Sequence, residues 1–88
     1  MYDALGSTEI YVGPPPPATH NMGTCRMARS ADDGACDPHG RSFDVPNLFF
    51  SDGSPFPSSG SSNPTLTIVA LATRQAEHIR QLMTSRQL

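Results

Sequence analysis

The chain of 88 residues is long enough for one small domain, but it is too short to enclose a dinucleotide together with an organic substrate. Leu, Ile, Val and Phe make up 16 of its residues and Pro, Gly and Ser make up 26, a loop-rich proportion that predicts a core completed by partner sequence. The net charge of −2 without a basic run excludes nucleic acid as an expected partner, and the apolar runs are too short for a membrane span.

The amino-terminal segment predicts a connector rather than a site. Residues 1 to about 12 carry scattered apolar side chains around Gly6, which predicts the end of a helix followed by a short strand. Residues 14–17 are four consecutive prolines, which favour a stiff polyproline II spacer because proline lacks a backbone donor. A small interaction module built around these prolines is the rival interpretation. The segment carries no targeting signal, which leaves the localisation open.

Turn residues and two cysteines follow. Segments 30–34 and 37–40 are rich in Ser, Asp, Gly and Pro, and they predict the turns of a surface hairpin over residues 29–41. Cys25 and Cys36 lie eleven residues apart and form no CxxC pair, so we expect two free thiols rather than a metal site. We expect Cys25 to be a small buried residue without a nucleophilic role.

The next apolar run predicts a strand. Residues 45–51 hold Val45, Leu48, Phe49 and Phe50 between turn residues, as in a parallel-sheet strand that is covered on both faces. The sequence Asp-Gly-Ser at 52–54 and the Pro/Ser/Gly stretch that follows then predict a loop. Ligands of open α/β sheets bind at such carboxyl ends of strands.

One helix is expected at the carboxyl end. Asn63 predicts its cap and Pro64 its first helical position, and no Gly or Pro interrupts the stretch from Thr65 to about Arg86. Residues 66–72 are apolar nearly all round, so we expect the amino-terminal end of the helix to be its buried end. The second half carries the side chains expected on its wet face, which are Arg74, Gln75, Glu77, His78, Arg80 and Gln81.

Of the three histidines, His20 has the most informative context, because it follows the rigid prolines and precedes the glycine-containing segment 21–27. His39 lies in an expected turn and His78 on the wet helix face, so we expect both at the surface without a role.

Four motifs together resemble the consecutive carboxyl-terminal signatures of the glucose-methanol-choline (GMC) oxidoreductases. The resemblance covers essentially residues 5–82, and both the order and the spacing of the motifs agree with the family. The motifs are Thr-His-Asn-Met-Gly-Thr-Cys-Arg-Met at 19–27, Val-Pro-Asn-Leu-Phe at 45–49, Asp-Gly-Ser-Pro-Phe-Pro at 52–57 and Asn-Pro-Thr-Leu-Thr-Ile at 63–68.

The resemblance implies roles for particular residues. His20 falls on the active-site histidine that takes the hydroxyl proton while the hydride passes to the flavin, and imidazole suits this task because its ordinary pKa of about 6.5 lies near neutral pH. Asn63 falls on the second catalytic position, where an amide can hydrogen-bond the substrate oxygen. Asp52 and Gly53 fall on positions that approach the flavin. The helix start at Asn63, Pro64 and Thr65 directs free amides toward the flavin ring.

The implied fold class is α/β. Residues 1–26 would form the tail of the substrate domain with the proline connector and the active-site histidine, and residues 27–88 the last strands and the closing helix of a Rossmann-like FAD domain. The implied function is oxidation of an alcohol or sugar hydroxyl by FAD, with the electron acceptor left open. The rival interpretation is a truncated, non-catalytic chain that is active, if at all, only when it associates with the missing amino-terminal part.

Overall fold

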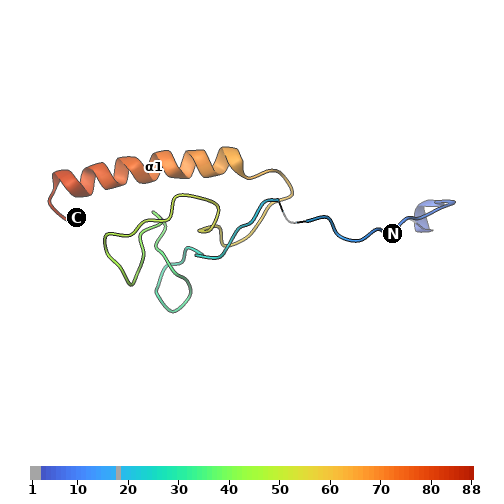
Figure 1. Ribbon diagram of the computed structural model, residues 1–88, viewed down its shortest axis with the longest axis horizontal. Coiled ribbons are helices and arrows are strands. Elements are labelled where there is room, and N and C mark those ends of the chain that lie inside the picture. Colours follow the sequence, from blue (N-terminus) through green and yellow to red (C-terminus); the bar gives the residue numbers. More distant parts are fainter. Residues whose placement is uncertain (1–2, 18) are drawn as a thin grey trace.

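The computed structural model describes residues 3–17 and 19–88. It divides into an extended arm, residues 3–17, and a loop layer, residues 19–64, against which one long helix lies. The molecule is elongated, with extents of 66 × 27 × 21 Å. The arm leaves the loop layer at the end opposite the carboxyl terminus (Figure 1).

The arm contains one short element. A 3₁₀ helix, η1, spans Asp3–Leu5, and Gly6 N–H closes its turn by donating to the Asp3 carbonyl at 3.1 Å. The rest of the arm is exposed and pairs with no other segment among the described residues, so the short strand expected near residue 12 does not form. Met1 and Tyr2, which belong to the expected helix end, lie outside the described residues.

The loop layer is held by turns and isolated bridges. Asp33 N–H donates to the Ser30 carbonyl at 3.2 Å and Gly40 N–H to the Asp37 carbonyl at 2.9 Å, which confirms both expected turns. The described residues form three isolated bridges, between Met27 and Cys36, Cys36 and Ser42, and Arg41 and Phe49. The layer therefore consists of short paired contacts rather than a sheet.

The prediction of a parallel-sheet strand over residues 45–51 is wrong. Only Phe49 takes part in a bridge, which is antiparallel, and Leu48 N–H closes a turn by donating to the Val45 carbonyl at 3.0 Å. Val45 is 45% exposed and Leu48 is 43% exposed, so nothing covers both faces of this run. A buried parallel strand needs a strand on each side and helices on its faces. The described residues thus form one α-helix, one 3₁₀ turn and no strand, and the α/β class is not confirmed.

The expected helix is present as α1, Thr65–Thr84, within two residues of its predicted end. Its cap residue is Pro64 (φ −87°, ψ −5°) and not Asn63, whose side chain makes no capping hydrogen bond. The prediction that the amino-terminal end is the buried end is also wrong, because Leu66 is 82% exposed and Val69 is 55% exposed. Neither described helix is long and apolar enough to cross a membrane.

Small residues form the best-buried part of the loop layer. Cys36 is fully buried, and its thiol donates to the Cys25 carbonyl with a sulfur–oxygen distance of 3.2 Å. Both cysteines are free thiols, as predicted, but Cys25 is only partly buried. Burial raises the pKa of Cys36, and the nearby Asp37 and Cys25 raise it further. Cys36 is therefore held as a neutral packing residue.

Candidate functional site

The segment after His20 runs beside the loop that begins at Asp52. Three backbone hydrogen bonds join the two, from Gly23 to the Gly53 carbonyl at 3.4 Å, from Cys25 to the Ser54 carbonyl at 3.0 Å and from Met27 to the Pro55 carbonyl at 2.8 Å. These bonds bring together two motifs that lie about thirty residues apart in the sequence. The histidine motif is thereby fixed to the Asp-Gly-Ser loop, a pairing that sequence spacing alone does not predict.

Gly53 is the closest point of contact between these segments. It is buried, and a Cβ atom at this position would lie 3.0 Å from the Asn21 carbonyl oxygen. The same Cβ would lie 3.4 Å from the Ile68 Cδ1 atom of α1 and 3.4 Å from Met22 Cγ. Glycine fits best here because the backbone after His20 and the side of α1 both pack against it and would have to shift for a side chain. We call the meeting of residues 20–23, 52–54 and 63–68 the junction.

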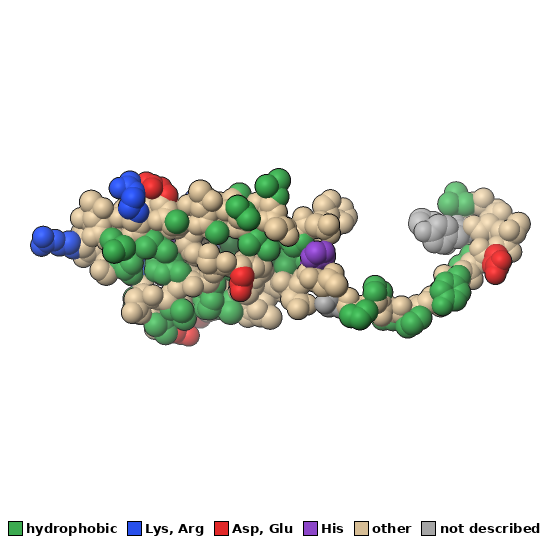
Figure 2. Space-filling model, turned by 45° about the horizontal axis from the view of Figure 1, so that its top comes forward, with side chains coloured by type: hydrophobic (Ala, Val, Ile, Leu, Met, Phe, Trp, Pro, Cys, Tyr) green, Lys and Arg blue, Asp and Glu red, His purple; other side chains and the backbone are tan. Residues whose placement is uncertain are grey.

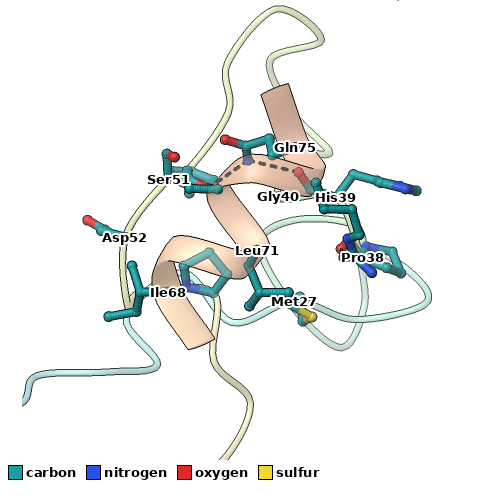
Figure 3. A pocket seen from close by; sticks show the side chains of 13 residues that line it. Met27, Pro38, His39, Gly40, Ser51, Asp52, Ile68, Leu71 and Gln75 are labelled. Atoms are coloured by element: carbon teal, nitrogen blue, oxygen red, sulfur yellow. Dashed lines mark hydrogen bonds between the residues drawn. The ribbon is translucent and has the colours of Figure 1, made fainter. Parts of the chain in front are cut away.

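Asp52 lies at the exposed edge of the junction. Its Oδ1 atom accepts hydrogen bonds from Ser54 N–H at 2.8 Å and from the Ser54 hydroxyl. These bonds lower the pKa of Asp52, mainly through the hydroxyl and then through the backbone amide. In Figure 3 its side chain points away from Gln75 and the helix. Asp52 is therefore an ionised carboxylate that stabilises its own turn.

Asn63, Pro64 and Thr67 border an open groove of about 550 Å³ at the amino-terminal end of α1. Asn63 and Thr65 are exposed and Pro64 is buried. The first helical hydrogen bond runs from Ile68 N–H to the Pro64 carbonyl at 3.0 Å, so the amides that precede Ile68 have no partner within the helix. The remaining lining residues are mostly apolar or small, among them Met22, Met27, Phe56, Pro57, Leu71 and the serines of the loop after Pro57.

His20 is exposed and does not line this groove. No hydrogen bond joins the side chains of His20 and Asn63, both of which the structure describes. Both predicted catalytic residues nevertheless belong to segments that meet at the junction, because His20 precedes Asn21 and Asn63 precedes the first turn of α1.

Gln75 is a feature that the sequence interpretation missed. It was expected on the wet face, yet it is only 6% exposed. Its Nε2 atom donates to the carbonyls of His39 and Phe50, both at 2.8 Å (Figure 3). The signal was present in the sequence, because Gln75 lies on the same helical stripe as Ile68, Leu71 and Leu82. A small cavity of about 20 Å³ lies beside it, between α1 and the loop layer.

His39 and His78 also differ from the expectation of two separate surface residues. Their rings stack with centroids 3.8 Å apart and an interplanar angle of 14°. Partial burial lowers the pKa of His39, and the neighbouring His78 and Arg74 lower it further against the opposing effect of Asp37. Arg74 also donates to the Pro38 carbonyl. The turn at 37–40 is therefore docked on the middle of α1.

Potential metal ligands do not gather in the described part of the chain, where no group of three or more His, Cys, Asp or Glu side chains could hold an ion.

Comparison with known proteins places these motifs in a family. The profile of the GMC oxidoreductases matches residues 16–72. The 2-methyl-1,2-propanediol dehydrogenase of Mycolicibacterium austroafricanum is 46% identical over 79 residues, which cover 86% of this chain and 14% of that protein. A C-glycoside 3-oxidase of Arthrobacter globiformis is 40% identical over 76 residues, which cover 85% of this chain and 15% of that protein.

A cholesterol oxidase of Acinetobacter baumannii is 42% identical over 72 residues, which cover 82% of this chain and 13% of that protein. No solved structure matches the chain significantly. The chain spans about one seventh of the length of the curated relatives that it matches. Since the matched profile is that of the carboxyl-terminal part and covers well over half of the residues, the chain belongs to the GMC oxidoreductase family and corresponds to its carboxyl-terminal region.

Proposed function

We propose that this chain is the proton-accepting, carboxyl-terminal end of an FAD-dependent oxidoreductase that acts on the CH–OH group of an alcohol or a sugar. The observation that carries the proposal is the junction, where the histidine motif, the Asp-Gly-Ser loop and the start of α1 pack on one another. The named relatives support the reaction class, because they are a diol dehydrogenase, a C-glycoside oxidase and a cholesterol oxidase.

The chemistry of the groove beside the junction supports the proposal of a bound flavin. A flavin ring is flat and apolar on its faces, and it carries carbonyl oxygens along one edge. The open amides at the start of α1 are donors for such oxygens, and the positive end of the helix favours negative charge there. Met22, Phe56 and Pro57 offer apolar walls. FAD, when bound, supplies the hydride acceptor.

Two side chains carry the proposed chemistry. An imidazole nitrogen of His20 accepts the proton of the substrate hydroxyl, a role for which an exposed histidine next to a rigid backbone is suited. The Asn63 side-chain amide donates a hydrogen bond to the same oxygen, and it is free to do so because it does not cap α1. Asp52, Gly53, Pro64 and Thr65 hold the flavin side of the site. In this proposal residues 1–26 end the substrate domain and residues 27–88 close a Rossmann-like FAD domain.

A chimera tests the proposal. The matching segment of the Mycolicibacterium austroafricanum dehydrogenase is replaced by residues 5–82 of this chain, and flavin content and alcohol-dependent dye reduction are measured on the purified full-length protein. We expect a flavin-loaded, active enzyme whose rate per flavin falls by roughly 10²- to 10⁴-fold when His20→Ala removes the base.

Two control variants make the test specific to position. His39→Ala and His78→Ala remove an imidazole elsewhere in the segment, and we expect the rate per flavin to stay within about threefold of the unmodified chimera. A chimera that binds no flavin or reduces no dye would contradict the proposal. So would a His20→Ala chimera with the full rate, because the proton would then be accepted elsewhere.

A further inference from the structure

We infer that Gln75 is a positioning residue that sets the orientation of α1 relative to the junction. The inference rests on the proposed function, because its consequence is measured as turnover. Gln75 lies near the middle of α1 and does not line the groove, which extends along the helix as far as Arg74. Neither the family motifs nor the expected wet face of the helix gave it a role. Its contacts make it the best-buried polar side chain of the helix.

The Gln75 amide joins three separate parts of the chain. Its Nε2 atom donates one hydrogen bond to the His39 carbonyl, 36 residues away, and one to the Phe50 carbonyl, 25 residues away. An amide nitrogen has two hydrogens, so this geometry uses its full donor capacity. Both carbonyls would lose a partner if the side chain were replaced by an apolar one of similar size. Gln75 therefore binds α1 to the 37–40 turn and to the segment that leads into Asp52.

Gly40 shows how closely this contact is fitted. It is buried with φ +77°, and a Cβ atom there would overlap the Gln75 Nε2 atom and lie 2.7 Å from the Phe50 carbonyl oxygen. The Phe50 amide in turn donates to the Gly40 carbonyl at 2.9 Å. The backbone at Gly40 therefore leaves space for the Gln75 amide, and any other residue at position 40 would be strained.

The contact is connected to the junction through short, continuous backbone. Phe50 precedes Asp52 by two residues, and the Asp52 loop carries Gly53, against which the backbone after His20 packs. In the other direction, α1 leads back from Gln75 through Ile68, which also lies beside Gly53, to its first residue Thr65, two residues after Asn63. Fixing α1 to Phe50 therefore fixes the spacing between the His20 side and the Asn63 side of the site.

The test uses the flavin-loaded chimera described above. Gln75→Met keeps the volume of the side chain but removes both donors, and we expect kcat per bound flavin to fall about 10- to 100-fold. KM should change less than kcat, and the flavin absorption spectrum should shift. Gln81→Met is the matched control on the exposed side of α1, where the Gln81 side chain hydrogen-bonds only to Glu77 among the described residues. We expect this control to keep the rate and the spectrum.

A further variant, Gln75→Glu, tests the same contact in a way that a change of pH can reverse. An ionised carboxylate facing two carbonyls repels them, whereas the protonated acid donates to one of them. Relative to the unmodified chimera at the same pH, its rate should be low at pH 8 and should partly recover at pH 6. Normalising to bound flavin separates this effect from a lower yield of folded protein. A full rate per flavin in Gln75→Met would overturn the inference, and it would leave the proposed function intact if His20→Ala still abolished turnover.

Discussion

The Asn63 side chain is not used to stabilise the helix that follows it. Because Pro64 takes the cap position of α1, the Asn63 amide is exposed at the groove and makes no capping hydrogen bond. Helix stability therefore does not depend on Asn63, as it would if its side chain capped the first turn. This separation allows the proposed contact with substrate to be tested without disturbing the helix.

Asn63→Asp in the chimera should lower turnover by about two to three orders of magnitude, because a carboxylate would place negative charge where the proposed reaction needs positive potential. Flavin absorbance and far-ultraviolet circular dichroism check that the cofactor and the helix remain. Asn47→Asp is the matched control, since Asn47 is also exposed but lies in the turn at residues 45–48. Equal rates in the two variants would refute the assignment of Asn63.

The two thiols should differ sharply in reactivity. Cys36 is fully buried with a raised pKa, whereas Cys25 is partly exposed. Since the thiolate is the reactive form, an aromatic disulfide reagent at pH 8 should modify Cys25 of the native chain first, with Cys36 at least tenfold slower. Cys25→Ser and Cys36→Ser identify the two phases. The prediction fails if Cys36 reacts first or both thiols react at one rate.

Elements of structure that depend on local interactions were predicted correctly from local sequence signals. The turns at 30–34 and 37–40 and the extent of α1 followed from turn residues and from an uninterrupted helical stretch, and the structure confirms them. The strand over residues 45–51 failed because a buried parallel strand exists only with neighbours on both sides. The docking of Gln75 was missed because a polar residue on an apolar stripe has partners that only the tertiary fold supplies.

For the candidate site, the sequence selected residues but did not predict how the segments that carry them pack. The motif resemblance selected His20, Asp52, Gly53 and Asn63, and the structure brings the segments that carry them into one junction. Backbone pairing between the histidine motif and the Asp-Gly-Ser loop could not be predicted, because neither segment is a regular element whose period reveals a partner. The stacking of His39 on His78 could not be predicted either, because one residue is in a turn and the other is on a helix, and no regular period relates the two.

The docking of the 37–40 turn on α1 should depend on pH. The pKa of His39 is lowered by burial and by the nearby His78 and Arg74, so the folded chain disfavours the protonated ring. A lowered histidine pKa contributes stability that is present above the ordinary value of about 6.5 and is lost as the pH falls through the lowered one. The free energy of unfolding should decrease by less than about 1 kcal/mol, because solvent screens the partly exposed pair of His39 and His78.

Two measurements check this prediction on the chain itself. In an NMR titration, the His39 ring protons should change at a lower pH than in a model peptide, and His78→Ala should move the midpoint back toward 6.5. The helix signal in circular dichroism should decrease as the pH is lowered from 7.5 to 5, a range above the ordinary pKa values of the carboxylates, so Asp52 and Glu77 contribute little there. An ordinary His39 midpoint would contradict the prediction.

At the scale of the whole molecule, the chain leaves much of its apolar surface uncovered. Apart from Pro55 and Pro64, Cys36 and Leu82 are the only buried apolar side chains among the described residues, and the exposed ones include Leu66, Val69 and Met83 on α1. Figure 2 shows hydrophobic side chains across the body of the molecule and along the arm. Monomeric soluble proteins rarely expose large contiguous apolar patches. The exposed face of α1 is the surface that partner sequence would cover in the proposed enzyme.

The isolated chain should therefore associate or unfold without a sharp transition, because ordering its loops costs conformational entropy that so small a core cannot offset. Light scattering after gel filtration and a thermal scan by circular dichroism measure both properties at micromolar concentration. Leu66→Gln combined with Val69→Gln should reduce association while the helix signal is kept, since both side chains are exposed. Leu82→Gln is the matched control, because Leu82 is only 8% exposed and its loss should weaken the helix signal instead. A monomer that melts cooperatively would show that the loop layer and α1 form a sufficient core, and the need for partner sequence would then be refuted.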